Sequence, residues 1–125
     1  MKLLIDSNAF IWMFTRPAEL SAIARQTLEN AENERFVSIA SIWEITIKVS
    51  IGKLVLPGKL DAAMHGIAAV SLPITLAHID RIQSLPFHHR DPFDRMLIAQ
   101  AMEEGMTVVT RDRHFASYGV PLLKA

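Results

Sequence analysis

Short apolar runs alternate with longer helical segments along the whole chain, and this alternation constrains the fold more than any other feature. Five runs are typical of strands, at residues 2–5, 36–38, 70–74, 107–110 and 120–123. Segments with helical spacing lie between them, at about 7–16, 21–30, 39–51, 60–69, 75–83 and 92–104, with a helical turn at 114–118. Strands that alternate with helices require right-handed crossovers. We therefore predict an α/β fold whose mainly parallel sheet of about five strands is covered on both faces.

The segment that begins at Asp91 carries the clearest helix signals. The Asp91 side chain can accept an unpaired backbone N–H as an N-cap, and Pro92 suits the first helical position. Gly105 is placed to end the helix. Asp94 is a second carboxylate in the opening turn, and capping does not need it. We therefore predict that Asp94 has another partner, a divalent cation shared with acids from other parts of the chain.

Three further acids stand near strand ends. Asp6 follows the first strand, Glu44 lies in the helix after the strand at 36–38, and Asp112 follows the strand at 107–110. Ligands of parallel sheets bind beyond the carboxyl ends of the strands, so we expect these acids and Asp94 to meet at one edge. Like charges at short range raise one another's pKa values, and a cation removes that cost. Oxygen donors in a chain without cysteine favour Mg²⁺ or Mn²⁺.

Taken singly, three of these acids also have structural explanations. Asp6 could cap the first helix, and Asp112 could lie in the first turn of the helical segment after residue 110. Glu44 could complete a capping box that begins at Ser41, or pair with Lys48 four residues on. The sequence leaves these explanations open beside the metal site.

Basic and aromatic residues near the acids are candidates for contacts with substrate or partner. Four arginines flank the predicted pocket and could bind phosphates or form ion pairs: Arg90, Arg95, Arg111 and Arg113. His88 and His89 could touch substrate or donate a proton, although adjacent residues rarely ligate one ion. The remaining histidines are expected at the surface or in packing: His65, His78 and His114. Trp12, Phe14 and Trp43 are expected in the core; their exposure would indicate a partner groove.

Composition excludes several classes of protein. The chain has 125 residues, which fits one domain spanning residues 1–125, and no cysteine, which excludes disulfides and thiolate metal sites. Its 13 basic and 13 acidic residues cancel, which disfavours a protein that coats nucleic acid through one basic face. No apolar run is long enough to span a membrane, and the N-terminus does not have the pattern of a signal peptide. We expect a cytoplasmic protein.

Four segments, taken in order, resemble the PIN-domain toxins of the VapC family, and the similarity spans nearly the whole chain. They are Leu4-Ile5-Asp6-Ser7-Asn8, Ser41-Ile42-Trp43-Glu44, Asp91-Pro92-Phe93-Asp94-Arg95 with Ile98-Ala99-Gln100-Ala101, and Val109-Thr110-Arg111-Asp112. The resemblance implies a three-layer α/β/α sandwich and a Mg²⁺- or Mn²⁺-dependent endoribonuclease. It also implies a homodimer, and a small antitoxin of the VapB kind that obstructs the active site.

Carried over by position, the family's acidic quartet corresponds to Asp6, Glu44, Asp94 and Asp112, with Asp6 and Asp94 the expected direct metal ligands. Ser7 and Thr110 are expected to assist at the rim. Asp91 belongs to the motif but is assigned chiefly to capping. Asn8 stands where the family often has histidine. Arg90 and Arg111 complete the candidates for contacts with substrate.

The predicted reaction is hydrolysis of RNA by a metal-activated water, leaving a 5′-phosphate and a 3′-hydroxyl. A first alternative makes Asp6 the nucleophile of a phosphatase similar to haloacid dehalogenases, but that chemistry needs an acid where this chain has Asn8. A second alternative is a catalytically silent module that binds an antitoxin or RNA. Binding of Mn²⁺ would distinguish an intact metal site from that of a catalytically silent module.

Overall fold

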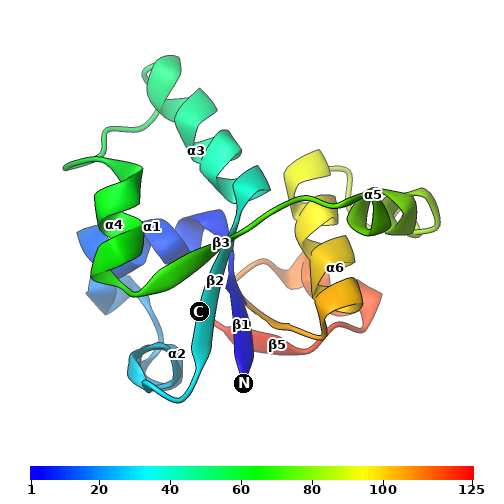
Figure 1. The fold of residues 1–125 in the computed structure, drawn as a ribbon, viewed down its shortest axis with the longest axis horizontal. Coiled ribbons are helices and arrows are strands. Elements are labelled where there is room, and N and C mark those ends of the chain that lie inside the picture. The colour runs from blue at the N-terminus through cyan, green and yellow to red at the C-terminus, as the bar shows by residue number, and fades with distance from the viewer.

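A five-stranded, all-parallel sheet forms the centre of the molecule in the computed structural model, which describes residues 1–125 (Figure 1). The strand order is β3-β2-β1-β4-β5. The strands are β1 (Lys2–Ile5), β2 (Glu34–Ser38), β3 (Ala69–Leu72), β4 (Thr107–Thr110) and β5 (Leu122–Lys124). The predicted α/β/α architecture with a parallel sheet is confirmed. The predicted strands agree with these bounds to within a few residues at each end.

Six α-helices and two 3₁₀-helices connect the strands. They are α1 (Ser7–Thr15), η1 (Pro17–Glu19), α2 (Ala22–Glu29), α3 (Ile39–Ser50), α4 (Leu60–Gly66), α5 (Leu76–Gln83), α6 (Pro92–Glu104) and η2 (Arg113–Tyr118). Helix α4 is shorter than the helix predicted at 60–69, because it ends at Gly66 and the chain enters β3 at Ala69. None of these helices is long and apolar enough to cross a membrane.

Alternating side chains of the strands divide the core between the two faces of the sheet. On β1, Leu4 packs with residues of α6 and η2, such as Leu97 and Phe115. Its neighbours on the strand, among them Ile5, pack on the other face with residues of α1 to α4, such as Phe10. This period of two follows from strand geometry. Burial on both faces explains why the strands are apolar runs rather than amphipathic ones.

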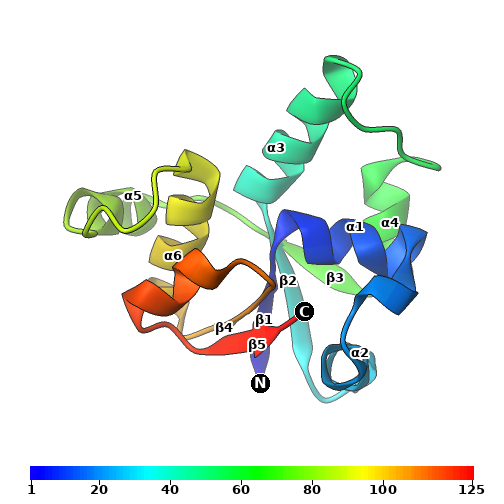
Figure 2. The ribbon, with the colours of Figure 1, turned by 180° about the vertical axis from the view of Figure 1, so that it is seen from behind.

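Polar side chains at the carboxyl ends of strands cap the helices that follow. Asp6 caps α1, Ser38 caps α3 and Asp112 caps η2, each with a side-chain oxygen that accepts a backbone N–H. Asp91 caps α6 in the same way, with Pro92 at the first helical position. The N-terminal ends of α1, α3 and α6 therefore lie near one another above the sheet, as both views show (Figures 1 and 2). Polar groups gather at that edge.

On α3, the prediction for Trp43 is wrong, and one of the explanations that the sequence left open for Glu44 is ruled out. Trp43 is not a core residue: it is 60% exposed on α3, where its ring meets the Phe93 ring edge-on. Trp12 and Phe14 are half-buried and pack against the core. The capping box from Ser41 does not form, because α3 begins earlier, with Ser38 as its N-cap, and Ser41 is buried inside the helix.

Candidate metal centre

The four acids of the predicted quartet line one polar hollow of about 400 Å³ at the carboxyl edge of the sheet. Asp6 comes from the end of β1, Glu44 from α3, Asp94 from α6 and Asp112 from the end of β4. The other lining residues are Ser7, Asn8, Trp12, Lys48, Asp91 and Arg111. Four carboxylates that are far apart in the sequence thus face a single space.

Asp6 is the most deeply placed of the four. Its carboxylate Oδ1 accepts the backbone N–H of Ala9 at 2.8 Å, so it caps α1 and lines the hollow at the same time. Burial raises the pKa of this carboxyl above its usual value. Hydrogen bonds from Thr110 and Ala9 act against that rise, while the charges of Asp112 and Glu44 add to it. The carboxylate form of Asp6 therefore costs free energy while no cation is bound.

Glu44 has two partners at the rim. Its Oε1 accepts the Ser7 hydroxyl at 2.6 Å, and its Oε2 lies 3.7 Å from the Lys48 ammonium. The ion pair with Lys48 that the sequence allowed is therefore present. Because Ser7 opens α1 and Glu44 lies on α3, their hydrogen bond ties the two helices together across the hollow. It also fixes which way the Glu44 carboxylate points.

Asp94 does not cap its helix; that is done by Asp91, which accepts the backbone N–H groups of Phe93 and Asp94. The Asp94 carboxylate instead meets the His89 ring, with 2.9 Å between Oδ2 and Nε2. The pKa of Asp94 is raised to about 7, chiefly by burial and then by the charges of Asp91, Glu44 and Asp112, while His89 acts against the rise. An acid that holds its proton near neutral pH marks a place where negative charge has accumulated.

Asp112 behaves differently because it has donors close by. Burial raises its pKa, but hydrogen bonds from the backbone and ring of His114, and from His89, outweigh that effect and leave the pKa below its usual value. Its Oδ1 lies 2.9 Å from the His114 backbone nitrogen, and its Oδ2 lies 3.1 Å from His89 Nε2. Asp112 is thus ionised at neutral pH and offers a negatively charged oxygen ligand to a cation.

This set of donors fits a hard divalent cation. The groups that line the hollow offer carboxylate, hydroxyl and amide oxygens and no sulfur, which is the ligand set of Mg²⁺ or Mn²⁺. Two of the carboxyls have raised pKa values that a cation would lower again. The arrangement is therefore chemically suited to hold such an ion and to neutralise a bound phosphodiester.

The other candidate residues fall into two groups. Ser7, Asp91 and Arg111 line the hollow, whereas Thr110 lies beneath it, with its Oγ1 accepting the Asp112 backbone N–H at 3.0 Å. Arg90 is exposed and is not among the lining residues. Arg111 lies over the Trp12 ring, 4.3 Å from its centroid, and pairs with Glu19.

Arg95 does not flank the pocket as expected. It is 6% exposed, and its guanidinium donates to the backbone carbonyls of Pro86 and Leu85 and to the Tyr118 hydroxyl. Its helical position points it toward the loop before α6, and the loop carbonyls take up its donors. Arg95 therefore holds this loop in place and has no free donor face for a phosphate.

His89 is the residue that sequence reasoning undervalued. Its Nε2 is shared between Asp94 and Asp112, and its backbone N–H donates to the Tyr118 hydroxyl. A histidine just before an acidic helix is a weak signal, and only the packing of η2 against α6 brings Asp112 within reach. His78, in contrast, is fully buried and bonds to Thr75 and Glu104, as a packing residue.

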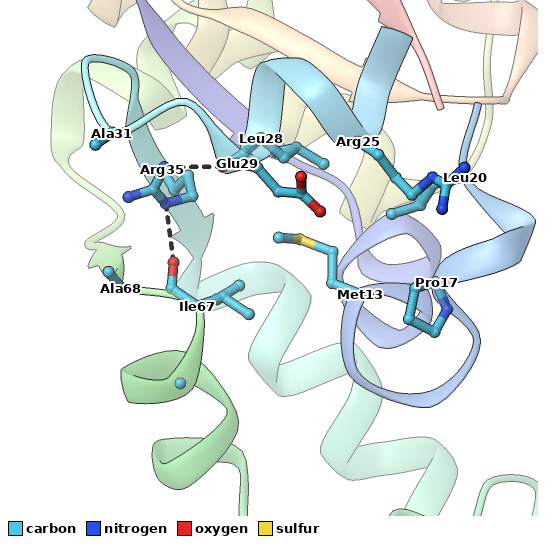
Figure 3. A pocket seen from close by; sticks show the side chains of 11 residues that line it. Met13, Pro17, Leu20, Arg25, Leu28, Glu29, Ala31, Arg35, Ile67 and Ala68 are labelled. Carbon is cyan, nitrogen blue, oxygen red and sulfur yellow. Dashed lines mark hydrogen bonds between the residues drawn. The ribbon is translucent and has the colours of Figure 1, made fainter. Parts of the chain in front are cut away.

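A second hollow of about 410 Å³ lies away from the acids, between α1, α2 and the end of α4 (Figure 3). Arg35 lies at one side of this hollow and donates to the backbone carbonyls of Leu28 and Ile67, which joins α2 to the end of α4. The arginine donors are thus engaged in holding the fold together. This hollow contains none of the quartet.

Comparison with known proteins gives a consistent result. The family model described as the PIN domain matches residues 3–121. Ribonuclease VapC22 of Mycobacterium tuberculosis is 28% identical over 124 residues, covering 94% of this chain and 92% of that protein. Among solved structures, VapBC2 from Rickettsia felis bound to a promoter DNA fragment has a TM-score of 0.70 at 13% identity, with 98% of each chain covered. FitAcB from Neisseria gonorrhoeae has a TM-score of 0.65 at 20% identity, covering 98% of this chain and 96% of that one.

Proposed function

The chain belongs to the PIN-domain family, and from that premise we propose that it is a metal-dependent endoribonuclease, the toxin of a toxin–antitoxin pair. The observation that carries the proposal is the shared hollow of Asp6, Glu44, Asp94 and Asp112. The name of the relative from Mycobacterium tuberculosis, a ribonuclease, supports the same activity. The reaction is hydrolysis of a phosphodiester, leaving a 5′-phosphate and a 3′-hydroxyl.

Asp6 and Asp94 would hold Mg²⁺ or Mn²⁺ directly, with Glu44 and Asp112 completing the negative site. When bound, such an ion activates water and neutralises the phosphodiester in the transition state. The protein's own residues do the positioning. Ser7 donates a hydrogen bond that orients the Glu44 carboxylate. Thr110 forms hydrogen bonds with the Asp6 carboxylate and the Asp112 backbone N–H, and the Asp6 side chain is itself buried from bulk water.

A basic hollow of about 530 Å³ adjoins the acidic one and shares Arg111 and Asp112 with it. Its other lining residues include Arg113 and Lys124, both exposed. Phosphates that flank the scissile bond of a single strand need such cations, because the acids alone would repel them. The chain has no net charge, so this local arrangement supplies the attraction.

The test is cleavage of RNA by purified protein with Mg²⁺ or Mn²⁺, compared with Asp94→Asn and Asp6→Asn. Both variants should lose cleavage while keeping the wild-type circular dichroism spectrum. Asp80→Asn, an exposed acid on α5, is the matched control and should cleave normally. Sequencing of the cut ends identifies both the target and the 5′-phosphate. Undiminished cleavage by Asp94→Asn would refute the assignment.

The rival function is a module that binds RNA or an antitoxin without cutting. It predicts that calorimetry detects no Mn²⁺ binding that depends on Asp6 or Asp94. The phosphatase alternative, with Asp6 as nucleophile, is disfavoured because the chain matches the PIN family and has Asn8 two residues on. A phosphoenzyme trapped on Asp6 would be needed to restore it.

We also propose an antitoxin of the VapB kind and a homodimer as the partners. The solved relatives from Rickettsia felis and Salmonella typhimurium are VapBC complexes bound to DNA, which supports the first. Exposed apolar side chains on α3, among them Trp43, Ile47 and Val49, offer surface for such contacts. We expect the protein to act in the cytoplasm, where its RNA target and antitoxin are made.

A further inference from the structure

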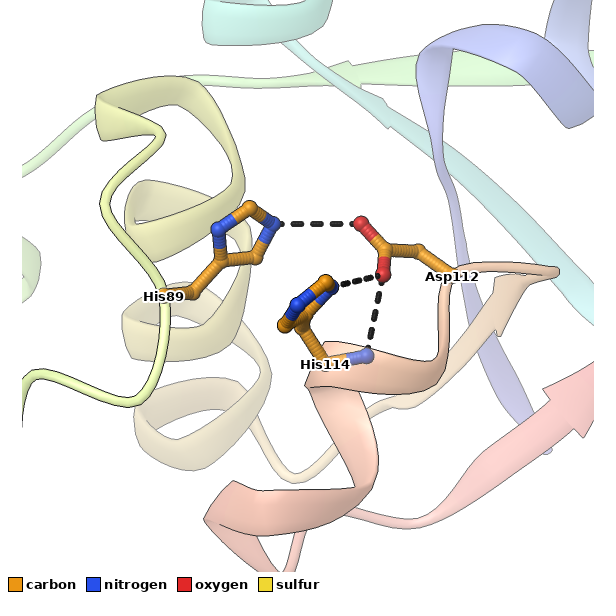
Figure 4. A group of neighbouring side chains, drawn as sticks. All are labelled: His89, Asp112 and His114. Atoms are coloured by element: carbon orange, nitrogen blue, oxygen red, sulfur yellow. Dashed lines mark hydrogen bonds and ion pairs between the residues drawn. The ribbon is translucent and has the colours of Figure 1, made fainter.

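Two histidines converge on one acid, as Figure 4 shows, and that acid, Asp112, also lines the acidic hollow. His89 lies in the loop before α6, Asp112 caps η2, and His114 lies in the first turn of η2. The Asp112 carboxylate is between the two rings, with Oδ2 at 3.1 Å from His89 Nε2 and Oδ1 at 2.8 Å from His114 Nδ1. One donor atom from each residue lies within 4.8 Å of the others.

This donor set differs in kind from the all-oxygen hollow beside it. Imidazole nitrogen is a preferred ligand of Zn²⁺, Co²⁺ and Ni²⁺, whereas Mg²⁺ prefers oxygen. We propose that His89, Asp112 and His114 form a binding site for a borderline divalent cation such as Zn²⁺. Three protein ligands leave one position of a tetrahedral ion open to solvent or to a phosphate oxygen.

The geometry needs only small movements to accept an ion. A tetrahedral Zn²⁺ with bonds of about 2.0–2.1 Å to nitrogen and oxygen holds its ligand atoms about 3.4 Å apart. The Asp112 carboxylate reaches the two rings through different oxygens, Oδ1 at 2.8 Å from His114 Nδ1 and Oδ2 at 3.1 Å from His89 Nε2. One donor atom from each residue lies within 4.8 Å of the others, so no pair of ligand atoms has to close by more than about 1.4 Å. The His114 side chain is 63% exposed, so its ring can turn and an ion can enter from solvent. The rings are also near each other, with centroids 4.7 Å apart.

His89 links this site to the acidic hollow through a single nitrogen. In the structure, His89 Nε2 is within 2.9 Å of Asp94 Oδ2 as well as near Asp112. Coordination uses the lone pair of Nε2 and moves the ring proton to Nδ1, at the cost of the weak 3.4 Å hydrogen bond in which Nδ1 accepts the Asp91 backbone N–H. A cation at the histidine site therefore exchanges the contact between His89 and Asp94 for a bond to metal. Asp94, which already lines the acidic hollow, then loses its contact with His89.

The experiment titrates metal-free protein with Co²⁺, whose visible d–d absorption reports low-coordinate nitrogen and oxygen ligation, in the presence of excess Mg²⁺. Competition with Zn²⁺ by calorimetry gives the affinity. The variants are His114→Ala, which alters an exposed side chain, and the matched control His65→Ala on α4. Asp6→Asn reports on the acidic hollow alone. Circular dichroism checks that each variant is folded.

We expect His114→Ala to weaken Co²⁺ and Zn²⁺ binding by at least about tenfold, since loss of a ligand costs no less than loss of a supporting hydrogen bond to one. His65→Ala and Asp6→Asn should keep the wild-type affinity and spectrum. Equal binding by His114→Ala and wild type overturns the proposal. So does loss of the Co²⁺ spectrum in Asp6→Asn with its retention in His114→Ala, because the ion would then lie among the acids. None of these readouts depends on nuclease activity.

Discussion

Replacement of Asp94 by Asn should stabilise the metal-free protein at alkaline pH. Asp94 is an acid whose pKa rises on folding from the usual 3.8 to about 7, chiefly because it is buried and secondly because Asp91 is near. The folded state therefore holds this proton more tightly than the unfolded state. The contribution of Asp94 to the free energy of unfolding is therefore greatest at low pH. It falls as the pH rises from about 4 to about 7 and stays reduced above that.

The size of the effect follows from the same values. At 1.36 kcal/mol per pH unit, the ionised carboxylate destabilises the folded state by about 4 kcal/mol before solvent screening. The side chain is 20% exposed and keeps its contact with His89, so we take about half, or ~2 kcal/mol at pH 8. Asparagine has nearly the same shape, and its amide oxygen can still accept from His89 Nε2. The substitution removes charge and little else.

The assay is urea unfolding in EDTA at pH 5, 6.5 and 8 for wild type, Asp94→Asn and the control Asp80→Asn. The gain from Asp94→Asn should grow with pH and reach ~2 kcal/mol at pH 8, while the control, an exposed acid, should change stability little at any pH. Saturating Mn²⁺ should stabilise wild type and narrow the gap, because the ion offsets the same charge. A gain independent of pH, or an Asp94→Asn variant less stable than wild type at pH 8, would refute the reasoning.

Three further predictions concern the fold, each measured by urea unfolding. Arg95→Met should destabilise by about 3–5 kcal/mol, because the loop carbonyls lose a buried charged donor, whereas Arg113→Met on the surface should change stability by less than about 0.5 kcal/mol. Leu97→Ala, which empties a core position, should cost about 2–5 kcal/mol. Gly105→Ala should lower the free energy of unfolding by about 1 kcal/mol through its φ of +64° alone, since no atom lies within 4 Å of the added carbon. Gly58→Ala should not have this cost, because Gly58 has no positive φ.

Local signals were sufficient for the elements of the fold. The alternation of apolar runs with helical spacing predicted the parallel sheet, and Asp91, Pro92 and Gly105 predicted the ends of α6. These features act between residues close in sequence, through capping, fixed φ angles and side-chain period, so they can be recognised without coordinates. The four acids were also recognisable, because their places after strands and at helix starts imply a common edge.

The roles of His89, Arg95 and Trp43 were decided by tertiary structure. Each depends on what other segments bring near. η2 brings Asp112 to His89, the loop before α6 brings carbonyls to Arg95, and the contact with Phe93 leaves Trp43 60% exposed. The sequence determined which residues can cap, pack or carry charge, because those are properties of a residue and its neighbours along the chain. Which other side chains join the four acids, and which stay apart from them, was decided only by the tertiary fold, because such contacts depend on distance through space.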